Sequence, residues 1–559
     1  MKRKTSIISL LFCGLLCLTA SLFLFTACDK EDKNATMEIT VTQVGEEQNV
    51  NVSWTTDFVY DTATVYVIHD GDVNYEKTYN ASDISETPLQ VPAFYGKHDV
   101  KVHLKKDNVT CTREKEVAVF ASEYNIAPLT ATMPVTMFSL SLPEITDNYT
   151  IPTFVWFKRS NAWNYEKMPA NVYTVPVATE KQIKGNSDQS VIYRLTNAWI
   201  KELYDINPSS HFHLFYNDYF GYGWMDATIA RGIPAENYDV SLLSDGTASF
   251  YYFNARLNNE NYATVYEEMK QEYTDLKAEI AEKGGYVEGG KYSISAGDMR
   301  DYAFVMAKEE PNLKWWLTRA SGTLGTATLE DGTVYDKLVA GEVGTKILIK
   351  DLKGLYTGLT DENKEMVRTL YDFGNSLFTE AVETNKKPMI ILGTWTKDER
   401  EWHFEDFVKA TMAYYGTEEY VYYYKGHPKN PTNTEPGKLE YLESLGLTDV
   451  DSTISAELFF FVYPSCVGTG FRSSTFLSTT DEQTGAIWNT RKDSFGESYK
   501  ENVDVYFSYI VKEDETYGEY VNGNGAVLIE LKDTSTYDFG IYNPDTNEIS
   551  YYKDGVKAN

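Results

Sequence analysis

Cysteine is scarce in this chain, which has five in 559 residues, and their positions exclude a disulfide framework. Cys13 and Cys17 lie within an apolar N-terminal run, and Cys28 follows closely after it. Only Cys111 and Cys466 remain, and they are far apart in the sequence. A cysteine-rich zinc site needs several clustered thiolates, so this class of metal site is excluded as well.

Histidine is also rare, and the short motifs of several enzyme classes are missing. None of the seven histidines pairs with another at the spacing of a His-Glu-x-x-His zinc motif. His211 and His213 alternate on a predicted strand and would face the same side of it. A two-histidine metal site and a structural role both stay open there, and we favour the structural role. The chain has neither Gly-x-Ser-x-Gly nor Gly-x-x-x-x-Gly-Lys-Ser/Thr, so the serine hydrolase and P-loop classes lose support.

Positive charge is in deficit, because 51 lysines and arginines face 82 acidic residues, which gives a formal net charge of −31. A field of that sign repels phosphate backbones, so general nucleic-acid binding is excluded, although a local basic pocket for one nucleotide stays open. Apolar residues are not lacking, since 42% of the chain is hydrophobic and 14% is aromatic. This composition excludes a largely disordered chain and supplies the cores of about three or four packing units.

Long apolar runs are missing except for one at the N-terminus, Ile7–Phe25, which follows the basic residues 2–4. The small residues that precede Cys28 make residues 1–27 similar to a bacterial lipoprotein signal peptide. A polar linker over residues 28–36 would follow it. A plain transmembrane anchor is the alternative interpretation of the same run.

Cleavage at this position would leave Cys28 to carry a lipid that anchors the protein to a membrane of the bacterial cell envelope. The segment Lys30-Glu31-Asp32 resembles the surface-export signal of lipoproteins in the Bacteroidetes lineage. We therefore expect a membrane-anchored lipoprotein, with the outer-membrane surface as its site.

Between Met37 and Phe120 apolar and polar residues alternate with a period of two. Val100, Val102 and Leu104 would face one side of a strand, and turn signals separate this run from its neighbours. Several short strands of this kind predict an immunoglobulin-like β-sandwich over residues 37–121. The buried cysteine pair of antibody domains is absent, so the likeness is one of architecture.

From about Ile126 apolar strands such as Phe154–Phe157 alternate with helical patterns, which predicts an α/β fold with a mostly parallel sheet. Apolar residues at helical spacing predict one helix through Val265–Ile280 and another through Met366–Leu377. The run Met389–Leu392 is a predicted buried strand that ends at a glycine. Such strand ends are where open α/β sheets bind ligands.

Three short segments carry residue types that group transfer needs. Asp245 follows a predicted strand, Lys425–Pro428 reads Lys-Gly-His-Pro after an aromatic strand, and Ser473-Ser474 follow a flexible glycine-rich turn. Each segment alone also fits an ordinary role as a turn, a loop or a helix cap. Their order carries more information, because a carboxylate takes a proton from a hydroxyl, and an imidazolium with hydroxyls holds a leaving phosphate.

In this order the segments resemble the bacterial sialyltransferases of glycosyltransferase family 80. No single motif is specific to that family, but the collinear set is. The resemblance implies the GT-B arrangement of two Rossmann-like domains, so the expected fold is α/β behind an immunoglobulin-like sandwich. The matching segments are Ser244–Thr247, Leu359–Asn363, Met389–Thr394, Lys425–Pro428, Ile454–Glu457 and Ser473-Ser474. The expected catalytic domains are residues 122–259 on the acceptor side, residues 260–525 on the nucleotide-sugar side, and a C-terminal segment, 526–559, that packs on them as an added layer.

The resemblance also implies roles for single residues. Asp245 matches the general base that deprotonates the acceptor hydroxyl, and His427 matches the residue that stabilises or protonates the departing phosphate. Glu457 matches the carboxylate that grips the ribose hydroxyls, and Asn217 matches an acceptor-side asparagine. The remaining matches would line the nucleotide and phosphate pocket, and they are Gly393, Thr394, Lys425, Gly426, Pro428, Ser473 and Ser474.

The implied reaction is a single inverting displacement that transfers a sialic acid from CMP-sialic acid to a galactose-type acceptor glycan. No cofactor and no metal site are expected, and we interpret Asp449-Val450-Asp451 as a polar turn. The expected partners are the nucleotide-sugar donor, the glycan acceptor and the lipid on Cys28, with the protein a monomer. The acceptor glycan stays open because Ser244 and Ser249 stand where the family has acidic residues.

Two other functions stay open. A surface glycan-binding lipoprotein on a transferase-derived scaffold would fit export, because sugar nucleotides are made in the cytosol. The joint presence of Asp245, His427 and Glu457 argues against such an inactive site. A glycosidase would need two carboxylates that flank one bond, and no motif selects such a pair.

Overall fold

The chain divides into two compact units, one of residues 1–122 with 198–211 and one of residues 123–197 with 212–559. Cys28 and the apolar run before it lie outside the described residues, so the signal peptide and the lipid anchor stay predictions. Within the part of the chain that is described, no helix is both long and apolar enough to cross a membrane. The computed structural model describes residues 30–32, 34–84, 88–158, 163–184, 189–220, 222–244, 249, 256–257, 261–284, 299–318, 346–373, 377–393, 404–428, 430, 432, 436–489, 503–509 and 526–558.

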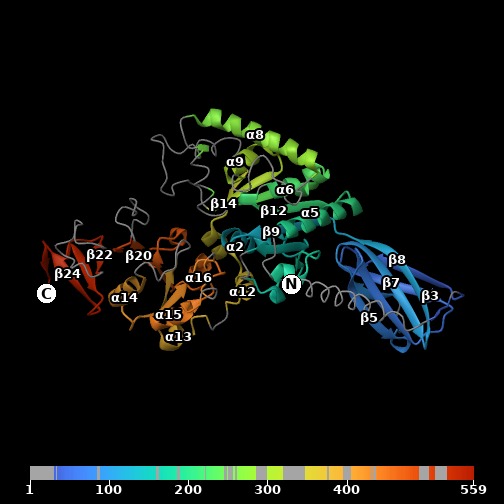
Figure 1. The fold of residues 1–559 in the computed structure, drawn as a ribbon, viewed down its shortest axis with the longest axis horizontal. Coiled ribbons are helices and arrows are strands. Elements are labelled where there is room, and N and C mark those ends of the chain that lie inside the picture. The colour runs from blue at the N-terminus through green and yellow to red at the C-terminus, as the bar shows by residue number, and fades with distance from the viewer. Residues whose placement is uncertain are drawn as a thin grey trace, which may run out of the picture. The chain divides into compact units, whose positions relative to one another are not determined.

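The first unit contains two β-sheets whose strands follow the period-two pattern of the sequence (Figure 1). Val100, Val102 and Leu104 are buried on one face, as the alternation predicts. The pairs are antiparallel except β1 with β8. These sheets support a β-sandwich over residues 37–121, whose immunoglobulin type stays a prediction. In sheet order, the strands are β1 (Lys30–Glu31), β8 (Val109–Val119), β7 (Gly96–Lys106), β4 (Thr62–His69) and β5 (Asp72–Asn80), then β2 (Met37–Gln43), β3 (Asn49–Thr56) and β6 (Leu89–Pro92).

Residues 198–211 belong to this unit because the second half of helix α5 (Gln189–Ile206) contacts the β-strands. The Trp199 ring is buried and donates from Nε1 to the Tyr95 carbonyl oxygen at 2.7 Å. The Glu202 carboxylate accepts from the Lys97 backbone N–H at 2.6 Å. The sandwich therefore carries a helical segment that the expected boundary at residue 121 leaves out.

The second unit contains a seven-stranded sheet with the order β11-β10-β9-β12-β13-β14-β15. Counted along the chain from β9, this order is 3-2-1-4-5-6-7, which is that of a doubly wound Rossmann-like sheet. The pairs among β9 to β11 and among β12 to β15 are parallel. The strands are β9 (Glu123–Thr130), β10 (Thr153–Lys158), β11 (Val172–Thr174), β12 (His211–Asn217), β13 (Tyr238–Leu243), β14 (Leu313–Leu317) and β15 (Ile347–Ile349). The helices in this stretch are α2 (Thr132–Leu140), α3 (Leu142–Ile145), α4 (Glu180–Lys184), α5, α6 (Tyr222–Ala227), α8 (Tyr262–Lys283) and α9 (Met299–Glu309).

A second sheet in this unit repeats the same topology. Its strands β18-β17-β16-β19-β20-β21 again follow the order 3-2-1-4-5-6 in parallel, and β22 to β25 extend the edge as antiparallel strands. The strands are β16 (Lys387–Leu392), β17 (Tyr420–Lys425), β18 (Thr448–Val450), β19 (Val467–Phe471), β20 (Thr484–Asn489), β21 (Val505–Tyr509), β22 (Val527–Leu531), β23 (Phe539–Asn543), β24 (Glu548–Lys553) and β25 (Val556–Lys557). The helices are α11 (Leu352–Gly358), α12 (Asp361–Leu370), α13 (Thr379–Thr384), α14 (Phe404–Tyr415), α15 (Lys438–Ser444) and α16 (Ala456–Val462).

The two parallel sheets confirm the expected α/β class, with the pair of Rossmann-like domains that a GT-B arrangement requires. The expected boundary after residue 259 needs correction. Strand β14 pairs with β13 and β15 pairs with β14, so the first domain extends through Ile349. The segment 526–559 extends the edge of the second sheet and is not an added layer.

Cys111 and Cys466 are buried and free, in agreement with the exclusion of a disulfide framework.

Local signals set the ends of two predicted helices. Helix α8 ends at Gly284, whose left-handed backbone, with φ of 65°, lets its N–H reach the Ile280 carbonyl. Helix α12 ends at Leu370, earlier than the predicted Leu377, because Asp372 adopts a positive φ of 51° that an α-helix does not accommodate. Phe373 is buried beyond this break, which explains why the apolar spacing continues in the sequence.

Candidate functional site

The carboxyl ends of β16, β17 and β19 surround a cavity of about 210 Å³, to which helix α2 of the first sheet adds Thr132 and Met133. In a doubly wound sheet the strand order reverses between the first and fourth strands, here β16 and β19, and ligands bind beside this switch point. Every described residue that the sequence assigns to the donor site lines this cavity. The lining residues are Thr132, Met133, Leu392, Gly393, Lys425, Gly426, His427, Pro428, Ile454, Ser455, Ala456, Glu457, Ser473, Ser474 and Thr475.

Two of the predicted site residues, Asp245 and Thr394, lie outside the described residues. Their assignment as general base and as part of the donor pocket stays a prediction. A larger cavity of about 460 Å³, lined by α2, α11 and α12, contains none of the predicted site residues. The sequence prediction therefore selects the smaller, more polar cavity as the candidate site.

Two glycines let β19 lie close to its neighbours beside the cavity. Gly470 has φ of 113°, and a Cβ there would lie 2.5 Å from the Leu392 carbonyl oxygen on β16. A Cβ on Gly468 would lie 2.6 Å from the Phe460 ring. These contacts explain why the glycines belong to a strand, and they correct the flexible turn that the sequence suggested.

Lys425 ends β17 with a fully buried side chain that points at backbone oxygens. Its Nζ donates to the carbonyl oxygens of Gly426 at 3.3 Å and of Ser452 at 3.2 Å. Burial lowers the pKa of Lys425 to about 8, and the nearby Glu457 carboxylate opposes that shift. The cavity therefore has a cationic wall whose charge is sensitive to pH.

The residues after Lys425 form a tight loop that places His427 on the cavity wall. A Cβ on Gly426 would lie 3.1 Å from Thr432 Oγ1 and 3.2 Å from the Asn430 carbonyl oxygen. The His427 carbonyl accepts from the Asn430 N–H at 2.8 Å, which closes the loop. The imidazole is half-buried and lines the cavity. The Lys-Gly-His-Pro order thus has a structural reason at each of its first three positions.

Glu457 lies in the first turn of α16 with its carboxylate buried beside the cavity. The Ser455 hydroxyl donates to Glu457 Oε2, which orients the carboxylate. A carboxylate held in this way is an acceptor for the hydroxyls of a sugar.

Ser473 and Ser474 begin the short 3₁₀ helix Ser474–Leu477 directly after β19. Ser473 Oγ accepts from the Thr475 N–H at 3.3 Å and contacts Thr475 Oγ1 at 3.1 Å. Both serines are half-exposed on the cavity wall. Hydroxyls and backbone N–H groups at such a turn are donors suited to an anion such as a phosphate.

The resemblance implies CMP as the ligand of this cavity, and we expect its affinity to fall as the pH rises through about 8. The reason is that Lys425 loses its proton in that range, and a phosphate dianion binds the ammonium form better. Calorimetric titration at about pH 7.5 and about pH 9.5 measures the effect, which approaches tenfold per pH unit. A Lys425→Met variant should bind CMP more weakly and without this pH dependence. Equal wild-type affinities at the two pH values would contradict the prediction.

Asn217, which the resemblance assigns to the acceptor side, ends β12 and bonds it to β9. Its buried side chain accepts from the Thr130 N–H at 2.8 Å and donates to the Thr130 carbonyl oxygen at 2.6 Å. These bonds join the two strand ends at the switch point of the first sheet. Asn217 does not line the donor cavity, and its contact with an acceptor stays a prediction.

Asp218 is a buried carboxylate at this switch point that the sequence analysis missed. It accepts from the Ser249 hydroxyl and from Trp315 Nε1 at 3.3 Å. The available signal was an acidic residue placed directly after the apolar strand 211–217.

The turn between β9 and α2 contains a strained residue beside the cavity. Ala131 has φ of 68° and ψ of 156°, a region that only glycine normally adopts. Such a conformation costs about 1–3 kcal/mol and is found where surrounding structure holds a functional segment in place. Thr132 and Met133, which follow directly, line the cavity.

No protein-family model matches the chain, and no curated protein matches it. Among solved structures, it is similar to the 2,6-sialyltransferase of Photobacterium sp. JT-ISH-224 in a ternary complex with CMP and lactose, with a TM-score of 0.49 and 12% identity over 83% of this chain and 88% of that one. It is similar to a sialyltransferase from Photobacterium damsela, with a TM-score of 0.46 and 13% identity over 82% and 91% of the two chains. It is also similar to an α/β-galactoside α-2,3-sialyltransferase from Photobacterium phosphoreum, with a TM-score of 0.45 and 12% identity over 66% and 91%. Similarity at this level does not specify a substrate or a reaction for this chain.

Proposed function

We propose that this protein is a glycosyltransferase that moves a sialic acid from CMP-sialic acid to a galactose-type acceptor glycan, with inversion and with no required metal. The observation that carries the proposal is the gathering of Gly393, His427, Glu457 and Ser473 around one cavity. These four positions lie far apart along the chain, and they were chosen from the sequence resemblance without any structural information. Packing brings these four residues to one cavity, at which β16, β17 and β19 end.

The chemistry of the cavity wall supports a nucleotide monophosphate as the bound part of the donor. Glu457 offers carboxylate oxygens to the vicinal hydroxyls of a ribose. The hydroxyls of Ser473 and Ser474 offer donors to a phosphate, and the charge of Lys425 favours an anion nearby. One acceptor group and several donor groups that line the same cavity match a ligand that carries both hydroxyls and a phosphate.

In the proposed reaction the acceptor hydroxyl attacks the anomeric carbon of the sialic acid. The new carbon–oxygen bond forms as the bond to the CMP phosphate oxygen breaks, and the electron pair leaves with the phosphate. Asp245 takes the proton of the attacking hydroxyl. His427 donates a hydrogen bond or a proton to the phosphate as its negative charge grows.

We also propose that a lipid on Cys28 holds this enzyme, as a monomer, at the bacterial cell envelope. The apolar run before Cys28 and the small residues next to it support this placement. The glycan-binding lipoprotein remains the competing function, and it predicts glycan affinity without turnover.

We expect CMP to raise the melting temperature of the purified chain more than UMP, GMP or AMP does, with EDTA present throughout. A ligand at 100 times its dissociation constant adds about 2.7 kcal/mol to the free energy of unfolding, which a thermal-shift assay detects. The same preparation should release CMP from CMP-sialic acid, and lactose should speed that release. A preference for UMP or GMP would overturn the donor assignment, and glycan binding without CMP release would favour the binding protein.

A further inference from the structure

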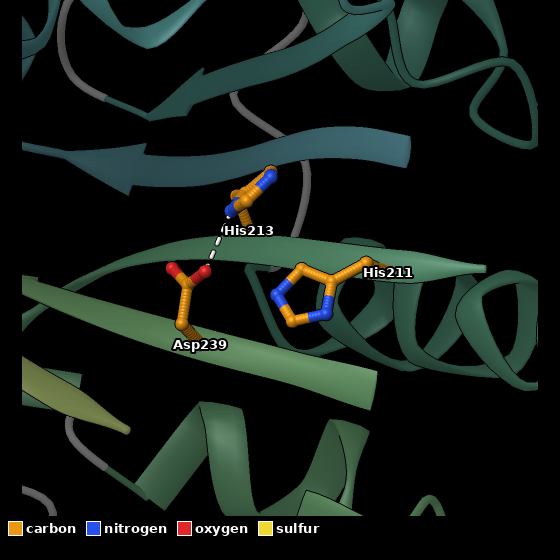
Figure 2. A group of neighbouring side chains, drawn as sticks. All are labelled: His211, His213 and Asp239. Atoms are coloured by element: carbon orange, nitrogen blue, oxygen red, sulfur yellow. Dashed lines mark hydrogen bonds and ion pairs between the residues drawn. The ribbon is translucent and has the colours of Figure 1, made fainter. Parts of the chain in front are cut away.

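A cluster of metal-ligand side chains lies at the amino ends of β9, β12 and β13, opposite the strand ends that face the switch point. Figure 2 shows His211 and His213 on β12 with Asp239 on the neighbouring strand β13. The two histidines share a face because alternate residues of a strand do so. The parallel register places His213 directly beside Asp239. Glu123, the first residue of β9, approaches His213 from the other side.

The distances within this cluster suit a single metal ion. One nitrogen or oxygen atom from each of His211, His213 and Asp239 lies within 4.8 Å of the others. His213 Nδ1 lies 2.6 Å from Asp239 Oδ2, and His213 Nε2 lies 3.8 Å from Glu123 Oε2. Zinc binds nitrogen and oxygen at about 2.0–2.2 Å, which places tetrahedral ligand atoms about 3.3 Å apart. Small side-chain rotations would bring these atoms to that spacing.

The strands beneath the cluster are held firmly, whereas the cluster itself is open to solvent. Tyr124 and Phe212 project from the opposite face of β9 and β12 and stack with ring centroids 5.5 Å apart. Both rings are fully buried, so the backbone that carries the cluster is fixed by packing. The side chains of His213 and Asp239 are 26% and 41% exposed, so an ion can enter from solvent.

The charges around His213 favour a cation. The carboxylates of Asp239 and Glu123 approach its ring from the two neighbouring strands, with oxygen–nitrogen distances of 2.6 and 3.8 Å. Two negative charges beside the ring would stabilise a divalent cation bound there. Imidazole and carboxylate together are ligands that zinc and the neighbouring transition metals accept.

We propose that His211, His213 and Asp239 bind one divalent transition-metal ion such as Zn²⁺, with Glu123 as a further oxygen ligand. The ion would join β9, β12 and β13 at their amino ends and stabilise the first sheet. The sequence analysis favoured a structural role for the histidine pair. The pairing of β12 with β13 places Asp239 beside His213 and so supplies the third ligand. The site lies away from the donor cavity and does not depend on the proposed transferase activity.

The test is metal binding by the full chain, purified without a polyhistidine tag and dialysed against EDTA before use. Calorimetry with Zn²⁺ should show one ion per chain, and Co²⁺ should give the visible absorption of a site with nitrogen and oxygen ligands. A His211→Ala, His213→Ala double variant should lose both signals. His103→Ala is the matched control, because His103 lies on β7 and bonds Thr112 Oγ1 at 2.8 Å, away from this cluster.

Two further measurements separate a metal site from an ordinary ion pair. Asp239→Asn keeps the shape of the side chain, removes its charge and should weaken Zn²⁺ binding relative to the wild type. Melting temperatures with EDTA and with Zn²⁺ separate any loss of packing in the double variant from loss of the ion. The proposal is overturned if the wild type binds no Zn²⁺, or if Zn²⁺ stabilises the double variant as much as the wild type. The response of the double variant to CMP should remain that of the wild type, which keeps this result distinct from the proposed function.

Discussion

Replacing His427 with alanine is expected to lower the rate of sialic acid transfer by about 10²–10³-fold, which is the usual cost of removing one donor to a developing negative charge. The departing CMP phosphate gains charge as its bond to the sugar breaks. The imidazole contacts that phosphate in the proposed complex, so its loss should weaken the binding of CMP as well as the transition state. Turnover of CMP-sialic acid with lactose and calorimetric binding of CMP measure the two effects separately.

The geometry of the loop explains why His427 is placed for this role. Lys425 is buried and pairs with backbone carbonyl oxygens, so its side chain holds the end of β17. A side chain at Gly426 would press against Thr432 Oγ1. His427 is therefore the first side chain after the strand that reaches the cavity wall while keeping access to solvent. The following Pro428 restricts the backbone there.

A conservative variant makes this prediction sharper. His427→Gln retains a hydrogen-bond donor but cannot deliver a proton near neutral pH. It should recover part of the CMP affinity that His427→Ala loses, while the transfer rate stays low. If His427→Ala transfers sialic acid within a few-fold of the wild-type rate, the loop histidine has no part in the reaction.

The sequence predicted the elements whose signals are local. Alternation at Val100 and Val102 identified a sandwich strand, because the period of two follows directly from strand geometry. The end of β16 at Gly393 was predicted in the same way, from an apolar run that stops at a glycine. The family resemblance selected the residues of the candidate cavity, and Gly393, Gly426 and His427 among them lie just after strands. In a parallel sheet such positions converge at one edge.

The missed features depend on contacts between distant segments. The first domain extends through β15 because that strand pairs with β14. The residues near the predicted boundary at position 259 carry no sequence signal for this pairing. Trp199 belongs with the sandwich through a hydrogen bond to Tyr95 that no periodicity encodes. Asp218 was missed because its burial depends on Trp315, nearly 100 residues later in the chain. Strand order and side-chain enclosure are set by tertiary packing, and a sequence pattern does not record them.

Changing Asp245 to asparagine is expected to reduce transfer by about 10²–10⁴-fold, which is the usual contribution of a positioned general base. A sugar hydroxyl has a pKa far above 7, so it is a poor nucleophile until a base takes its proton as the new bond forms. Asparagine keeps the size of the side chain and removes this basicity. Asp245 follows Ser244, whose backbone N–H donates to the Trp316 carbonyl oxygen at 3.0 Å, so the preceding residue is fixed in the sheet.

The pattern of effects separates this role from a structural one. Because the proposed base contacts the acceptor and not the nucleotide, Asp245→Asn should leave the affinity for CMP and the melting temperature close to wild type. Asp275→Asn is a matched control, since Asp275 is exposed on α8 and accepts a local bond from Gln271 Nε2 at 2.9 Å. Initial rates with CMP-sialic acid and saturating lactose measure the change. A transfer rate within a few-fold of wild type for Asp245→Asn would leave the residue as a turn former. The reaction would then require a different base, and the buried Asp218 directly after β12 is a candidate.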